Sequence, residues 1–178
     1  WLHYERGGGR SVKTAARSLV TRKGDWLHNF YKQGETDYHN AGANGAAMRN
    51  LPIGLVACGD EGRLVLDSFQ NAVISHGHPR AILGTILFGL AVRYALVEDD
   101  TAAPHMIDYL RQMTDDAGRR VADQKVVSDW VKGWEQRKKS PQGTFRAAFA
   151  DTRHEAHRFL EAIPEFLSRP AVEYYRFV

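Results

Sequence analysis

Apolar residues recur at helical spacing along most of the chain. Between residues 10 and 22, for example, Val12, Ala15 and Leu19 lie three or four positions apart, with basic residues between them. This spacing places the apolar side chains on one face of an α-helix. We therefore predict a helix over residues 10–22 that ends near Gly24, because glycine often follows the last helical turn.

Helix-start residues mark three further segments. Asp60 is placed to cap a helix that contains Leu64, since its carboxylate can accept from the first free backbone N–H groups. Pro79 suits the first turn of an apolar helix that runs to Val97. Pro52 is compatible with a helix only near its start or at a kink.

The rest of the chain is also predicted to be helical, and the fold class is all-α. Sustained alternation of apolar and polar residues with hairpin turns, which a sheet would require, is not found in the sequence. By this pattern count the chain forms a compact bundle of about seven to nine helices. The remaining segments are a short aromatic helical patch at 26–31, a loop at 34–42, a helix that opens at Thr101 or Pro104, helices over 121–134 and 144–160, a solvated linker at 138–141, and short closing helices that begin at Pro164 and Pro170.

Length and composition are typical of one soluble globular domain, so we assign residues 1–178 to a single all-α domain. The apolar run 81–97 is interrupted by Arg93 and is short for a bilayer. It therefore predicts a core helix and no membrane partner. Cys58 is the only cysteine, which excludes a disulfide framework and makes a cytoplasmic location the expectation.

The charge balance and the chain ends add two expectations. A formal net charge of +3 is compatible with an anionic ligand but is no nucleic-acid footprint, so we expect no nucleic-acid partner. The basic segment 10–23 is most simply a solvated helix face, with a protein or RNA partner as the alternatives. Neither end has the polar composition usual at native termini, which indicates the central part of a longer domain. The oligomeric state stays open.

The segment 41–49 carries the most specific chemistry. It is a Gly/Ala/Asn loop that turns helical from Gly45 onward. Free backbone N–H groups at the start of a helix suit a phosphate or a ribose oxygen. From local sequence alone, Asn44 fits a helix cap better than a ligand contact. A second polar segment, 75–79, precedes the apolar helix and could point at the same ligand.

Together these two segments resemble the ADP-ribosylglycohydrolase family, in particular members like the dinitrogenase reductase-activating glycohydrolase. Residues 43–49 read Ala-Asn-Gly-Ala-Ala-Met-Arg, similar to the family's Gly-Asn-Gly-Ala-Ala-Met-Arg. Residues 75–79 read Ser-His-Gly-His-Pro, similar to its Thr-His-x-His-Pro. The resemblance implies a helical bundle of the ADP-ribosylglycohydrolase type with two Mg²⁺ ions. It also implies hydrolysis of the glycosidic bond between ADP-ribose and a protein or small acceptor.

The resemblance further implies a set of ligand-binding residues and leaves the catalytic residue unassigned. In the family the loop wraps ADP-ribose with backbone N–H groups and the Asn, and the first His of the second motif lies near the distal ribose. Ala43 adds a methyl group where the family has Gly, and Gly42 replaces an aromatic surface for which Tyr38 could substitute. The residues implied to bind ligand are Gly42, Ala43, Asn44, Gly45, Ala46, Met48, Ser75 and His76.

Several residues of the two motifs also have structural alternatives. Met48 is equally suited to core packing, and Arg49 to a buried pair. A histidine next to an apolar helix, such as His76, is commonly a core residue bonded to a carbonyl. His78 directly precedes Pro79 and is interpreted as a helix-start residue.

The family's metal-binding carboxylates are not found here in the family's order. The segment 98–101 reads Glu-Asp-Asp-Thr, but it follows the histidine motif, so it is interpreted as a solvated turn with an N-cap. Asp115 and Asp116 are no better candidates for Mg²⁺ ligands. His154 and His157 have the spacing of a zinc pair but lack a third ligand. We therefore expect the Mg²⁺ ligands outside this segment. The alternatives are a catalytically inactive ADP-ribose-binding relative and a purely helical protein-interaction domain.

Overall fold

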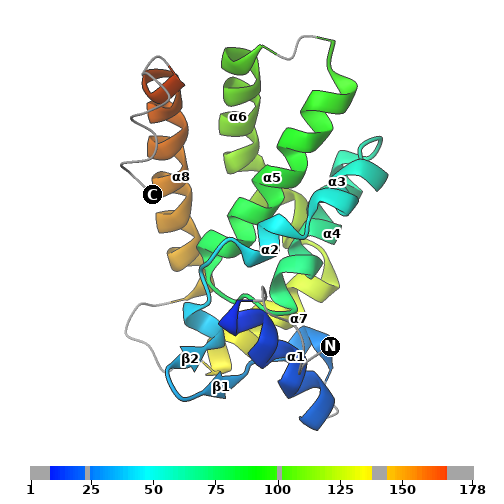
Figure 1. Cartoon of the computed structure of the whole chain (residues 1–178), viewed down its shortest axis with the longest axis vertical. Coiled ribbons are helices and arrows are strands. Elements are labelled where there is room, and N and C mark those ends of the chain that lie inside the picture. The colour runs from blue at the N-terminus through cyan, green and yellow to red at the C-terminus, as the bar shows by residue number, and fades with distance from the viewer. Residues whose placement is uncertain (1–8, 23–24, 100–101, 138–143, 168–178) are drawn as a thin grey trace.

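The computed structural model describes residues 9–22, 25–99, 102–137 and 144–167 of the 178-residue chain. Helices dominate these residues, which confirms the predicted all-α class (Figure 1). The α-helices are α1 (Arg10–Arg22), α2 (Gly45–Met48), α3 (Leu51–Val56), α4 (Glu61–Val73), α5 (Pro79–Val97), α6 (Ala103–Ala122), α7 (Lys125–Arg137) and α8 (Phe145–Leu167).

A short connection between α1 and α2 holds the described strands. It consists of a 3₁₀ turn η1 (Trp26–His28), an antiparallel hairpin of β1 (Lys32–Gln33) and β2 (Thr36–Asp37), and a second 3₁₀ turn η2 (Tyr38–Asn40). Gly34 turns the hairpin with a positive φ of 57°. Each strand has two residues, too few for the alternation that predicts a strand. The loop expected over 34–42 is therefore partly a hairpin and partly a 3₁₀ turn.

Helix α5 is the central helix of the bundle (Figure 1). Helices α2, α3, α4, α6 and α8 all pack against it. Its side chains Ile82, Ile86 and Leu90 are at most 1% exposed, which confirms the predicted core helix. By length and composition alone, α5 is also the one helix of the described residues that is long and apolar enough to cross a membrane.

Local start signals locate the helices accurately. The Asp60 carboxylate accepts from the Arg63 N–H at 3.0 Å, as expected of the cap of α4. His78 is the N-cap of α5, where its Nδ1 accepts from the Arg80 N–H at 3.1 Å. Pro52 lies in the first turn of α3. The predicted helix starts at Pro52, Asp60 and Pro79 are therefore confirmed. His78 is also confirmed as a helix-start residue.

Helix ends in the second half of the chain differ from the predicted ones. Helix α6 continues to Ala122, so the helix expected over 121–134 begins instead at Lys125. Pro164 lies inside α8 and starts no new helix. A proline there removes one backbone hydrogen bond, but it lies three residues from the end of α8, where little of the helix depends on that bond. Thr101, the linker 138–141 and Pro170 lie outside the described residues.

An aromatic core joins the chain before α2 to the start of α5. Tyr38 is 0% exposed, and its hydroxyl donates to the Val73 carbonyl at 2.5 Å and accepts from Trp130 Nε1 at 3.0 Å. Trp134 Nε1 donates to the Gly77 carbonyl at 2.8 Å. A Cβ atom at Gly77 would lie 2.2 Å from the Tyr38 ring, so only glycine fits there. The two motif-bearing segments are thus fixed against each other.

Candidate functional site

The predicted loop ends in a single helical turn. Helix α2 has four residues, and the Met48 N–H donates to the Asn44 carbonyl at 3.0 Å. The N–H groups of Gly45, Ala46 and Ala47 precede this bond, so they have no carbonyl partner within the helix. A turn of this length has a small dipole. Any attraction for an anion must therefore come from the N–H groups themselves.

The side chain of Asn44 is not a helix cap. It is exposed, and it makes no capping hydrogen bond to α2. The backbone of Asn44 has φ −74° and ψ 2°, outside the left-handed region in which asparagine is favoured. Asn44 thus occupies the N-cap position of α2, as the alternative predicted, but its side chain makes no capping hydrogen bond, and the amide is left at the surface, where it can both donate and accept.

Arg49 fixes the loop from below. Its Nε donates to Asn71 Oδ1 at 2.8 Å, and its Nη2 donates to the Asn71 carbonyl. Its Nη1 lies 3.4 Å from the Gly45 carbonyl, within hydrogen-bond distance. Burial lowers the pKa of Arg49. Arg49 is therefore paired within the structure, as its alternative predicted, and its partners are the Asn71 side-chain amide and backbone carbonyls.

A buried chain of amides continues from Asn71 into the core. Its Nδ2 donates to the Ala46 carbonyl at 3.3 Å and to Asn50 Oδ1 at 2.9 Å. Asn50 is 0% exposed and donates in turn to Ser68 Oγ at 2.9 Å. A Cβ atom at Gly89 would lie 2.8 Å from Asn50 Nδ2, so the glycine makes room for the amide. Sequence reasoning missed Asn50 and Asn71, and no periodic or motif signal marks them.

Ser75 and His76 lie beneath the loop. Ser75 is 2% and His76 1% exposed, and Ser75 Oγ lies 2.9 Å from His76 Nδ1. A Cβ atom at Gly45 would lie 3.4 Å from His76 Cε1 and Nε2, so the imidazole is against the first residue of α2. The structure thus brings the two predicted motifs together, with the histidine covered by the loop.

The environment of His76 keeps its imidazole neutral. Burial, which removes water from the charged form, and the nearby Arg49 guanidinium lower the pKa of His76 to about 4. A neutral imidazole has one donor and one acceptor nitrogen. Because Nδ1 is in contact with the Ser75 hydroxyl, Nε2 is the nitrogen on the side of the loop.

The eight implied ligand-binding residues divide by exposure. Three of them, Ala43, Asn44 and Met48, are exposed, and Met48 is 72% exposed, so its core-packing alternative is wrong. Tyr38 is buried in the aromatic core, so it cannot replace the missing aromatic surface. The ligand-binding roles themselves stay predictions. Gly42 and Gly45 are partly exposed, whereas Ala46, Ser75 and His76 are buried.

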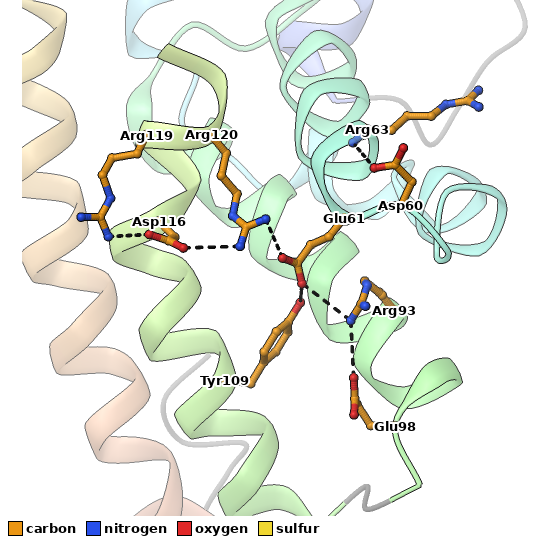
Figure 2. A network of polar contacts seen from close by, with 9 residues as sticks. All are labelled: Asp60, Glu61, Arg63, Arg93, Glu98, Tyr109, Asp116, Arg119 and Arg120. Carbon is orange, nitrogen blue, oxygen red and sulfur yellow. Dashed lines mark hydrogen bonds and ion pairs between the residues drawn. The ribbon is translucent and has the colours of Figure 1, made fainter. Parts of the chain in front are cut away.

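A second polar network, on α4, α5 and α6, has a structural character. Figure 2 shows it around Glu61, whose carboxylate accepts from the Tyr109 hydroxyl at 2.6 Å. The same carboxylate lies 2.8 Å from Arg120 Nη1 and 3.7 Å from Arg93 Nη1. Burial and the bond to Glu61 raise the pKa of Tyr109. Because Glu61 on α4 is matched by cations from α5 and α6, the network joins three helices.

The acidic and histidine clusters considered as metal sites are also paired with other groups. Glu98 lies 3.6 Å from Arg93 (Figure 2), while Asp100 and Thr101 lie outside the described residues. Asp115 lies 3.1 Å from His157 Nε2. In the part of the chain that the structure describes, no group of three or more His, Cys, Asp and Glu side chains could hold a metal ion.

Comparison with known proteins adds a family assignment to this geometry. The family model described as ADP-ribosylglycohydrolase matches residues 1–168. No curated protein and no solved structure matches the chain significantly. The family match covers nearly the whole chain, including both motifs and every described residue. The chain therefore belongs to the ADP-ribosylglycohydrolase family.

Proposed function

We propose that the loop 41–49 binds the ADP-ribose part of an ADP-ribosylated substrate, and that the protein is a glycohydrolase that cleaves the bond between ADP-ribose and its acceptor. The observation that carries the proposal is the exposed Asn44 amide, which makes no capping bond and directly precedes Gly45, the loop residue that lies against the buried His76. The family match supports the reaction class.

The geometry supports recognition of an anionic sugar nucleotide. The backbone N–H groups at the start of α2 suit phosphate or ribose oxygens, and Asn44 adds a donor and an acceptor. Arg49 places a guanidinium under the loop, which favours a negatively charged ligand above it. The methyl group of Ala43 restricts how closely the ligand approaches, compared with the glycine typical of the family.

Pre-organisation is the second supporting feature. The Ala46 carbonyl accepts from Asn71, and the Gly45 carbonyl lies within reach of Arg49, so the turn is held before any ligand arrives. A loop that is already ordered loses less conformational entropy on binding. We assign His76 to the same function: as a neutral group under Gly45, it supports the loop without adding charge.

The family is one of metal-dependent glycohydrolases, and the described residues do not fit a metal. Hard cations such as Mg²⁺ require several oxygen ligands, which carboxylates usually supply. Residues 9–22, 25–99, 102–137 and 144–167 include no cluster of that kind. We therefore derive no catalytic step from these residues, and we propose that they provide recognition while the metal-binding carboxylates lie elsewhere.

A protein-interaction domain is the competing function, and one observation favours it. An apolar cavity of about 510 Å³ lies between α5 and α8, with Leu87, Phe88 and Phe159 among its lining residues. Phe88 is 38% and Phe159 65% exposed. Exposed apolar surface of this kind commonly marks a contact with another protein. A domain that only used this surface would not bind ADP-ribose.

Calorimetric titration of the intact chain with ADP-ribose, with and without Mg²⁺, tests the proposal. We expect saturable heat from the wild-type protein and weaker binding by Asn44→Ala. Asn40→Ala is the matched control, because Asn40 is an exposed asparagine just before the loop. Absence of heat under both conditions from a folded sample, or equal loss in both variants, contradicts ADP-ribose recognition by this loop.

A further inference from the structure

A small polar cavity lies between helix α1 and strand β1, apart from the loop that carries Asn44. Its volume is about 190 Å³. Helix α1 contributes hydroxyl groups and a guanidinium, and β1 contributes an ammonium group and an amide. These side chains are Thr14, Arg17, Ser18, Thr21, Lys32 and Gln33.

The helical spacing places four of these groups on one face. Thr14, Arg17, Ser18 and Thr21 occupy positions i, i+3, i+4 and i+7 of α1. Residues at this spacing are neighbours on a helix surface. The basic segment therefore does more than present a solvated face, because its hydroxyl-bearing side lines a concave site.

Positive charge in the cavity is not neutralised by the described chain. No residue that lines the cavity is acidic, and α1 contains no Asp or Glu. Arg17 and Lys32 form no ion pair with another described residue, unlike Arg63, whose Nε lies 3.3 Å from its carboxylate partner. Asp37 is opposite Lys32 in the hairpin, but its carboxylate accepts from the His39 N–H at 2.8 Å.

The base of the cavity is rigid. Tyr31 is 2% exposed, and its hydroxyl donates to the Ser75 carbonyl at 2.8 Å. Ser18 is 8% exposed, so the hydroxyl face of α1 is the buried side of the cavity. The hydroxyls of Thr14 and Ser18 make no hydrogen bond to another described residue and can donate to a ligand.

We propose that this cavity binds a phosphate group, either as free phosphate or as the phosphate of a small phosphomonoester. Phosphate oxygens accept strong charge-assisted hydrogen bonds from guanidinium and ammonium groups. The Thr14 and Ser18 hydroxyls complete the donor set, while the lack of an acidic lining residue avoids repulsion of the ligand. This site is distinct from the loop 41–49 and does not depend on the proposed function.

Chemical-shift titration of the intact ¹⁵N-labelled chain tests the proposal. Sodium phosphate and glycerol phosphate are each compared with sodium chloride at equal ionic strength. We expect saturable shifts of the α1 and β1 amides that chloride does not produce. If glycerol phosphate binds more tightly than phosphate, a phosphomonoester is the ligand, and if the two bind equally, the phosphate group alone suffices.

Variants distinguish a built site from general charge attraction. Arg17→Gln and Lys32→Gln are each expected to weaken binding by about fivefold or more, because each removes a charge-assisted contact. Arg10→Gln removes the same charge from an exposed position of α1 outside the cavity and should have a much smaller effect. Shifts no larger than with chloride, equal losses in all three variants, or loss of the shifts in Asn44→Ala would overturn the proposal.

Discussion

Replacing Asn71 by alanine is expected to destabilise the protein. Asn71 is not part of the loop 41–49, but its side chain bonds to Arg49 and Ala46 of that loop. The substitution removes the acceptor of Arg49 Nε at 2.8 Å and the donor to the Ala46 carbonyl at 3.3 Å. It also removes the donor to Asn50 Oδ1 at 2.9 Å. Arg49 keeps its bond to the Asn71 backbone carbonyl, so the guanidinium is only partly unpaired.

The expected magnitude follows from these three contacts. A hydrogen bond to a charged group contributes about 1.5–3 kcal/mol and a neutral one about 1 kcal/mol. Alanine returns about 0.6 kcal/mol, because asparagine is a poorer helix former. The free energy of unfolding of Asn71→Ala should therefore fall by about 3 kcal/mol, and the affinity of the loop for ADP-ribose should fall with it.

Urea unfolding followed by circular dichroism measures the effect. Gln70→Ala is the matched control, since it truncates the neighbouring amide of α4 and removes no such network. A double-mutant cycle with Arg49→Met measures the interaction free energy between Asn71 and Arg49. A loss below about 1 kcal/mol for Asn71→Ala, or additive losses in the cycle, would refute the view that these amides hold the turn in place.

Three further substitutions test separate parts of the site. Asn44→Ala should lower ADP-ribose affinity in calorimetry while leaving Tm as in Asn40→Ala; a large drop in Tm would restore the capping role. Gly77→Ala should cost about 3 kcal/mol of stability in urea, because its Cβ would meet the Tyr38 ring at 2.2 Å, whereas Gly84→Ala, with nothing within 4 Å, should be tolerated or stabilising. The pKa of His76 is about 4 in the folded chain and near 6.5 unfolded, so the unfolded state binds more protons between these values. The contribution of neutral His76 to the free energy of unfolding should therefore be fully present above pH 6.5 and be lost as the pH drops toward 4. His76→Gln should reduce the dependence of the free energy of unfolding on pH in this range. An unchanged pH dependence in that variant contradicts a buried neutral imidazole.

The local part of the fold could be predicted from the sequence. The cap at Asp60 and the start of α5 at His78 and Pro79 depend on residues within one turn of each other, and both were correct. The predictions of a helix starting at residue 121 and of a new helix at Pro164 were wrong. A helix can continue past a weak stop signal when tertiary packing supports it.

The site could be predicted as a pair of segments but not as a supported structure. Residues 43–49 and 75–79 were identified by motif, and the structure places them in contact through Gly45 and His76. The bonds that hold them join residues 21 to 25 positions apart, such as Asn71 to Asn50 and to Ala46. Contacts at that separation leave no periodic pattern in a single sequence, so the amide network could not be expected.

The amide network changes the physical explanation of how the loop would bind an anion. The sequence predicted free N–H groups at the start of a helix as the site for a phosphate or a ribose oxygen. Helix α2 is a single turn, so its dipole is small, and the directed groups are three backbone N–H donors and Asn44. Such donors are effective only if they are held in place, and Asn71 and Arg49 hold the carbonyl side of the same peptide units. Affinity should therefore depend on residues that never touch the ligand, and removing Asn71 should weaken ADP-ribose binding even where the fold survives.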